Sequence, residues 1–144
     1  MFKILVPVDF SDFSSQAVEH AKREVIAFGG QVTLLYVIHN VPRLYYFGGL
    51  DDTSMAHMVE TERDHAIQLL KEYKGRFEGI QAEVDTLILE GDPAERIIDY
   101  AEENPVDLIV MGSQGIGSPM RRVFLGSVAN RVLHHVKVPV LVVR

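Results

Sequence analysis

Short apolar segments alternate with longer amphipathic segments along the whole 144-residue chain, and this alternation limits the possible folds more than any other feature. Between the apolar segments, hydrophobic residues recur every three or four positions, which is the spacing of one helix face. The apolar segments have the length and β-branched character of strands buried on both faces. They are Ile4–Val8, Val32–Ile38, the stretch from Ala82 to Leu89, Leu108–Met111 and Pro139–Val143. This order predicts an α/β fold with an open parallel sheet and helices on both faces.

Local signals mark the ends of two of the four predicted helices. Ser11 is a good N-cap for the first helix, and Gly29-Gly30 ends it. Asp92-Pro93 opens the third helix, because proline suits the first helical position, and Asn104-Pro105 stops it. The other two helices are predicted from apolar periodicity, over about Ser54–Lys74 and Leu125–Val136. We expect one domain over residues 1–144, since no linker or repeat interrupts the pattern.

Composition removes several classes of function. The formal net charge of −6 argues against a nucleic-acid surface, because such surfaces cluster Lys and Arg. The chain has no cysteine, which excludes disulfides, thiolate zinc sites and thiol catalysis. No apolar run reaches the roughly 18 residues of a membrane-spanning helix, and the N-terminus does not resemble a signal peptide. We therefore expect a cytoplasmic protein with no membrane or nucleic-acid partner.

A glycine-rich segment before the last predicted helix carries the clearest functional signal. The apolar run stops at Gly112, Gly115 and Gly117 follow, a basic pair Arg121-Arg122 comes next, and Gly126-Ser127 opens the helix. A strand that leads through glycines to a helix N-terminus is suited to anions. The segment matches neither the P-loop nor the G-x-G-x-x-G fingerprint. From these residues alone, phosphate or nucleotide binding and an ordinary glycine-rich turn both remain open.

The suggestive residues follow the first and the fourth predicted strands, as Asp9 and Gly112. In open parallel sheets, ligands bind beyond the carboxyl ends of the strands, where the strand order reverses. If these two strands are neighbours, the order is 3-2-1-4-5 and the reversal lies between them. Asp9, the end of the second strand and the glycine segment would then line one crevice.

Six short motifs occur along the chain, and their order and spacing resemble the universal stress protein family over essentially the whole length. They are Val6-Pro7-Val8-Asp9-Phe10-Ser11, Leu34-Leu35-Tyr36-Val37, Gly91-Asp92-Pro93, Asp107-Leu108-Ile109-Val110-Met111-Gly112-Ser113, Gly126-Ser127-Val128-Ala129 and Val138-Pro139-Val140-Leu141-Val142-Val143. The resemblance implies a Rossmann-like five-stranded sheet, a homodimer and, in one branch of the family, bound ATP.

The resemblance also implies site residues. The family's ATP-binding pattern falls on Gly112, Gly115, Gly126 and Ser127, but ten residues separate Gly115 from Gly126 where the pattern has nine. The extra residue is expected in the Gly117-Ser118-Pro119 stretch. Contacts to the nucleotide are further implied for Pro7, Asp9, Val37, Met111 and Val128. Gly117, Arg121 and Arg122 are candidates for support of the phosphate loop. Mg²⁺ would be held mainly by phosphates and water, because the predicted site offers few carboxylates.

Simpler structural roles compete with several of these assignments. Asp9 or Ser127 could cap a helix, and Val37 or Met111 could be plain core. The histidines do not predict a metal site: His57 and His65 lie eight residues apart on one predicted helix, and His134-His135 point to different sides of another. Only His39, at the end of the second strand, is expected near the crevice.

We therefore expect an ATP-dependent dimeric sensor or adaptor, with the dimer formed through the apolar edge strand Val138–Val143. No spacing places a catalytic acid beside a base. One alternative is a nucleotide-free dimerisation scaffold of the same fold. Another is slow ATP hydrolysis or self-phosphorylation, with Ser127 or Ser118 as the acceptor. The Tyr45–Gly49 stretch is either a lid over the ligand or a packing surface for a partner or a helix.

Overall fold

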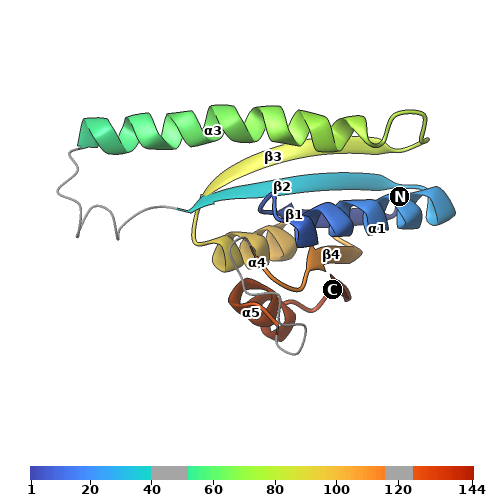
Figure 1. Ribbon diagram of the computed structural model, residues 1–144. Helices are drawn as coiled ribbons and strands as arrows, with labels where there is room; N and C mark the ends of the chain where they lie inside the picture. The colour runs from blue at the N-terminus through green and yellow to red at the C-terminus, as the bar shows by residue number, and fades with distance from the viewer. Residues whose placement is uncertain (40–51, 116–124) are drawn as a thin grey trace.

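Strands and helices alternate through residues 1–39, 52–115 and 125–144, which are the residues that the computed structural model describes (Figure 1). The strands are β1 (Lys3–Val8), β2 (Gln31–His39), β3 (Glu83–Gly91), β4 (Leu108–Gly112) and β5 (Val140–Val143). The helices are α1 (Asp12–Phe28), α3 (Asp52–Gly75), α4 (Pro93–Glu103) and α5 (Ser127–His135). The elements therefore follow one another as the hydrophobic pattern predicts.

The five strands form one parallel sheet in the order β3-β2-β1-β4-β5. Ile4 of β1 lies in register with Val32 of β2 on one side and with Leu108 of β4 on the other. All strands are parallel, but successive strands are placed toward one edge from β1 to β3 and toward the other edge from β4 to β5. The strand order therefore reverses between β1 and β4. The predicted strand order and Rossmann-like class are confirmed, and the ligand crevice of such sheets falls between these two strands.

Successive residues of the central strands face two separate cores, because side chains alternate along a strand. Val6 and Leu34 pack with α1 and α3 on one face of the sheet. Leu5 and Leu35 pack with α4 and α5 on the other face. Helices thus cover both faces, and Figure 1 shows α3 running lengthwise along β2 and β3.

The helix starts follow the predicted capping signals, with one difference. The Ser11 hydroxyl accepts the Ser14 N–H at 3.2 Å and caps α1. The Asp92 carboxylate accepts the Glu95 N–H at 3.0 Å and caps α4, in which proline is the first residue. In α5 the N-cap is Gly126, and Ser127 is the first helical residue. The interpretation of Ser127 as an N-cap is therefore wrong.

Two parts of the fold, the end of α1 and the strand β3, are more exposed than the hydrophobic pattern predicts. Phe28, an aromatic residue at the end of the first helix, is 71% exposed and packs edge-on against Phe2. It is the last residue of α1. β3 is an edge strand, so its charged residues Glu83 and Asp85 face solvent instead of a second layer.

Candidate functional site

A cavity of about 1070 Å³ opens at the carboxyl ends of β1, β2 and β4. Its walls come from the β1–α1 turn, the end of β2, the first turns of α4 and α5, and one side of α3. The volume lies just above the range of about 300–1,000 Å³ that is usual for small-molecule sites. All nine residues predicted to contact a nucleotide line this cavity: Pro7, Asp9, Val37, Met111, Gly112, Gly115, Gly126, Ser127 and Val128. The structure thus brings the predicted set together, and contact with a ligand remains a prediction.

The β1–α1 turn holds Asp9 in a defined orientation. The Asp9 N–H donates to the Ser14 hydroxyl at 3.3 Å, and Asp9 Oδ1 accepts the Ser11 N–H at 3.0 Å. The intervening residue, Phe10, has a φ of 65°, a strained value for a bulky residue and one that occurs preferentially at functional sites. Ser11 is the N-cap of α1, so Asp9 braces the turn and does not cap the helix itself.

The glycine segment begins where α1 leaves no space for a side chain. A Cβ atom on Gly112 would lie 2.7 Å from the Phe13 Cβ and 2.8 Å from its carbonyl carbon. A Cβ on Gly115 would lie 3.1 Å from Asp9 Oδ2. Glycine at 112 is therefore required by packing, whereas glycine at 115 leaves room beside a carboxylate in the cavity wall.

The two ends of the glycine segment are joined by a backbone hydrogen bond. The Gly126 N–H donates to the Ser113 carbonyl at 2.7 Å. A Cβ on Gly126 would lie 3.2 Å from that same oxygen, so the two ends are in close contact. The ten-residue spacing therefore does not separate Gly115 from Gly126 in space. Gly117, Ser118, Arg121 and Arg122, like the Tyr45–Gly49 stretch, lie outside the described residues.

The first turn of α5 offers backbone N–H groups to the cavity. Gly126 provides no side-chain cap, and Ser127 and Val128 line the cavity. The first N–H groups of a helix have no partners within the helix and carry partial positive charge. Ala129 and Val132 are buried and anchor α5 on the sheet. This turn is suited to an anionic group.

The apolar part of the cavity is shared with the core between the sheet and α4. Val37 is 8% exposed and Met111 is 4% exposed, and both belong to the core cluster on this face. Both also line the cavity. Core packing and ligand contact are therefore compatible roles for these two residues.

Sequence reasoning missed the wall that α3 contributes. His57, Thr61, Glu62 and His65 line the cavity from this helix, opposite Tyr36. The Tyr36 hydroxyl donates to Glu62 Oε1 at 2.5 Å, and burial together with this bond raises the pKa of Tyr36 above its ordinary value. Strand alternation places Tyr36 on the face opposite Val37, but no local pattern predicts which side of α3 would meet it. His39 lines the cavity as expected.

Among the described residues, the lining carries carboxylates but no Lys or Arg. Asp9 and Glu62 are the acidic residues of this wall. A phosphate group would therefore depend on backbone N–H groups, on the Ser127 hydroxyl, on the lining histidines, on a bound cation, or on residues beyond those described here.

Two further negative findings apply to residues 1–39, 52–115 and 125–144. No three His, Asp or Glu side chains there are grouped so that they could hold a metal ion. None of the helices in these ranges combines the length and hydropathy needed to cross a membrane.

Comparison with known proteins decides the family. The sequence profile of the universal stress protein family matches residues 1–144. The chain belongs to the universal stress protein family. Universal stress protein MJ0531 of Methanocaldococcus jannaschii is 36% identical over 143 residues, which cover 99% of this chain and 81% of that protein. The structure of the universal stress protein UspA from Lactobacillus plantarum is 32% identical, has a TM-score of 0.87 and is matched over 97% of its length and 99% of this chain.

More distant structures of the family carry adenine nucleotides. A universal stress protein in complex with cAMP has a TM-score of 0.68 at 23% identity, covering 99% of this chain and 96% of that one. A family member from Arabidopsis thaliana with AMP bound has a TM-score of 0.69 at 18% identity, covering 99% and 91%. At these identities the likeness to this chain shows the shared fold.

Proposed function

We infer that this universal stress protein binds an adenine nucleotide in the cavity at the carboxyl ends of β1, β2 and β4. The single observation that carries the proposal is that the nine residues implied by the family resemblance all line one cavity. They come from β1, β2, β4, the following turns and α5, which are far apart in sequence. The cAMP and AMP complexes of distant family members support the same class of ligand.

The cavity suits the three parts of a nucleotide differently. Val37 and Met111 offer a flat apolar contact for adenine, and the methionine thioether adapts to an aromatic face. The Asp9 carboxylate, oriented by the turn, accepts hydrogen bonds from ribose hydroxyls or from an adenine N–H. The N–H groups at the start of α5 and the Ser127 hydroxyl donate hydrogen bonds to phosphate oxygens.

ATP with Mg²⁺ is the ligand that we propose. The described lining has carboxylates at Asp9 and Glu62 and no Lys or Arg, so a triphosphate needs another source of positive charge. Mg²⁺ supplies it when bound, because it prefers phosphate oxygens and keeps several waters. Arg121 and Arg122, which the sequence places in the same segment as the glycines, add to it.

The biological role we propose is that of a cytoplasmic dimeric sensor or adaptor, whose partner choice depends on the bound nucleotide. β5 is an edge strand, and an uncovered apolar edge invites pairing with a second copy. Pairing through Val138–Val143 gives two-fold symmetry.

The test is to identify what the purified protein carries. Heat denaturation followed by removal of the protein releases bound small molecules, which chromatography and mass spectrometry identify. Adenine nucleotide in about equimolar amount supports the proposal. If none is released and added ATP with Mg²⁺ does not bind, the proposal is wrong and the nucleotide-free scaffold takes its place.

A further inference from the structure

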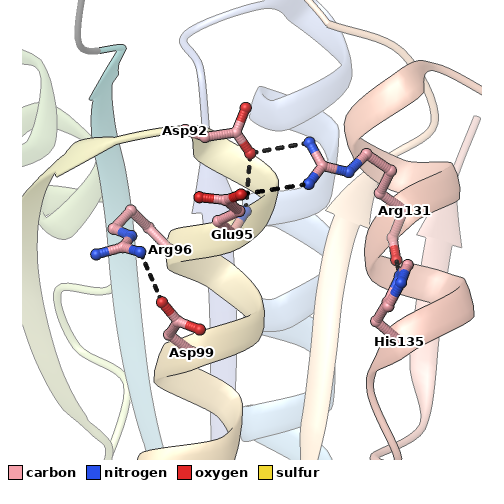
Figure 2. Close-up of polar contacts among 6 residues, drawn as sticks. All are labelled: Asp92, Glu95, Arg96, Asp99, Arg131 and His135. Carbon is pink, nitrogen blue, oxygen red and sulfur yellow. Dashed lines mark hydrogen bonds and ion pairs between the residues drawn. The ribbon is translucent and has the colours of Figure 1, made fainter.

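The guanidinium group of Arg131 joins α5 to the start of α4 (Figure 2). Arg131 Nη1 of α5 lies 2.9 Å from Asp92 Oδ2, and Nη2 lies 4.0 Å from Glu95 Oε1. The other ion pair in the same view, Arg96 with Asp99 at 2.7 Å, stays within α4. Only the first of these two contacts therefore ties the two helices together.

Asp92 is a fixed anchor for this link. It directly follows Gly91, the last residue of β3, which lies in register with His39 of β2. Its Oδ2 atom also accepts the Glu95 N–H at 3.0 Å as the N-cap of α4. A group that pairs with Asp92 is therefore positioned relative to the carboxyl edge of the sheet.

Arg131 connects that anchor to the part of α5 that faces the cavity. It lies four residues after Ser127, so the two residues are neighbours on the same side of the helix. Ser127 and Val128 line the cavity, and so does Pro93, which follows Asp92. The link thus lies next to residues of the cavity lining and joins the N-terminus of α4 to the middle of α5.

The first turn of α5 is held on the β4 side by the Gly126 N–H, which donates to the Ser113 carbonyl at 2.7 Å, whereas the Arg131 link holds the helix to α4. The helix has nine residues, its N-cap Gly126 makes no side-chain hydrogen bond, and its buried residues are Ala129 and Val132. Ser127 is exposed. Short helices depend on tertiary contacts to hold their ends.

We propose that Arg131 is a positioning residue for the phosphate end of the ligand: its link to Asp92 and Glu95 holds the first turn of α5 in place at the cavity. This inference rests on the proposed function. Both partners are partly exposed, so the link adds little to overall stability. The link instead affects the affinity for ligands whose phosphate groups reach the N-terminus of α5.

The test compares ligands with and without phosphate by calorimetry. Arg131→Gln is expected to weaken ATP and AMP by about two- to fivefold and to leave adenosine unchanged. Arg131→Lys, which keeps one charged donor for Asp92, restores part of the loss. Arg96→Gln is the matched control: it breaks an ion pair confined to α4 and is expected to leave all three affinities unchanged.

Asp92→Asn provides the second arm, because asparagine still caps α4 but loses the charge that holds Arg131. It is expected to weaken ATP as Arg131→Gln does, and the double variant is expected to bind no more weakly than the weaker single variant. Tighter ATP binding in Asp92→Asn would overturn the proposal. It would show that the Asp92 charge repels the phosphates and that Arg131 only neutralises this charge. If Arg131→Gln weakens adenosine as much as ATP, the proposal is also overturned, because a general loss of order in the cavity would then explain both losses.

Failure of this inference and failure of the proposed function give different results. If the unsubstituted protein binds neither ATP nor adenosine, the nucleotide site itself is wrong. If that protein binds ATP and the Arg131→Gln protein, folded by circular dichroism, binds it equally well, only the positioning role is wrong.

Discussion

The carboxylate oxygen Oδ2 of Asp9 lies 3.1 Å from the position that a Cβ atom on Gly115 would occupy. These residues follow β1 and β4, the neighbouring strands between which the sheet order reverses. The contact joins the proposed ribose-binding carboxylate to the glycine segment that leads toward the phosphate end. Both groups therefore have to stay in place for one ligand to reach them together.

Gly115→Val tests this contact directly. The added side chain displaces the Asp9 carboxylate and fills the cavity wall, so we expect ATP affinity to fall by roughly tenfold or more, with little change in melting temperature. Gly75→Val is the control, because a Cβ there meets nothing within 4 Å. Unchanged ATP affinity in Gly115→Val, measured by calorimetry, would show that the ligand does not use this wall.

Asp9→Asn separates ligand binding from folding. Asparagine keeps an oxygen for the Ser11 N–H, so the turn is retained, but the charge offered to ribose or adenine is lost. A hydrogen bond to a charged group contributes about 1.5–3 kcal/mol, so affinity is expected to fall by about ten- to a hundredfold. Asp9→Ala also removes the turn's acceptor and is expected to lower the free energy of unfolding by about 1 kcal/mol. If the asparagine variant binds ATP normally, Asp9 serves only the turn.

Asp92 predicts a pH dependence of stability. The Glu95 N–H, and then the Arg131 guanidinium, lower the pKa of Asp92 below its ordinary value of 3.8, although burial opposes this. A carboxylate with a lowered folded-state pKa stabilises the protein above its unfolded pKa, and this contribution is lost as the pH falls through the folded pKa. The difference in unfolding free energy between the unsubstituted protein and Asp92→Asn should therefore shrink from about pH 6 to about pH 2, by urea denaturation. A difference that stays constant would contradict the assignment.

The free edge of β5 predicts which backbone groups a second copy would use. The carbonyls of Pro139 and Val143 accept from Ile109 and Ser113 on the β4 side, so the backbone groups of Val140 and Val142 point away from β4. Val142→Pro removes one outward N–H, a change that edge strands tolerate. We expect it to convert a dimer to a monomer in sedimentation equilibrium, while Val142→Thr leaves the dimer intact. A protein that is monomeric before substitution would rule out this interface.

The strand order follows once the first and the fourth strands are taken as neighbours, and the residues after these strands suggest that they are. Asp9 and Gly112 follow two short apolar runs, and a shared crevice requires those runs to be adjacent. Ser11 and Asp92 cap their helices as predicted, since capping depends on neighbouring backbone groups.

The rest of the site depends on long-range packing that no local pattern contains. The side of α3 that faces Tyr36 is set by how a 24-residue helix lies across β2 and β3, so Glu62 and His57 could not be assigned to the cavity from sequence. The close contact of Gly126 with Ser113 likewise depends on the chain ends of a segment meeting in space. Phe28 is exposed at the last position of α1, where the helix spacing alone would place it on the apolar face.

Isothermal titration of ATP with Mg²⁺ into the protein, freed of any bound nucleotide, tests the central claim most directly. The account predicts saturable binding of one nucleotide per chain with micromolar affinity or better, equivalent to about −8 kcal/mol. A flat titration of folded protein would contradict it, and the cavity at the ends of β1, β2 and β4 would then not be an adenine-nucleotide site.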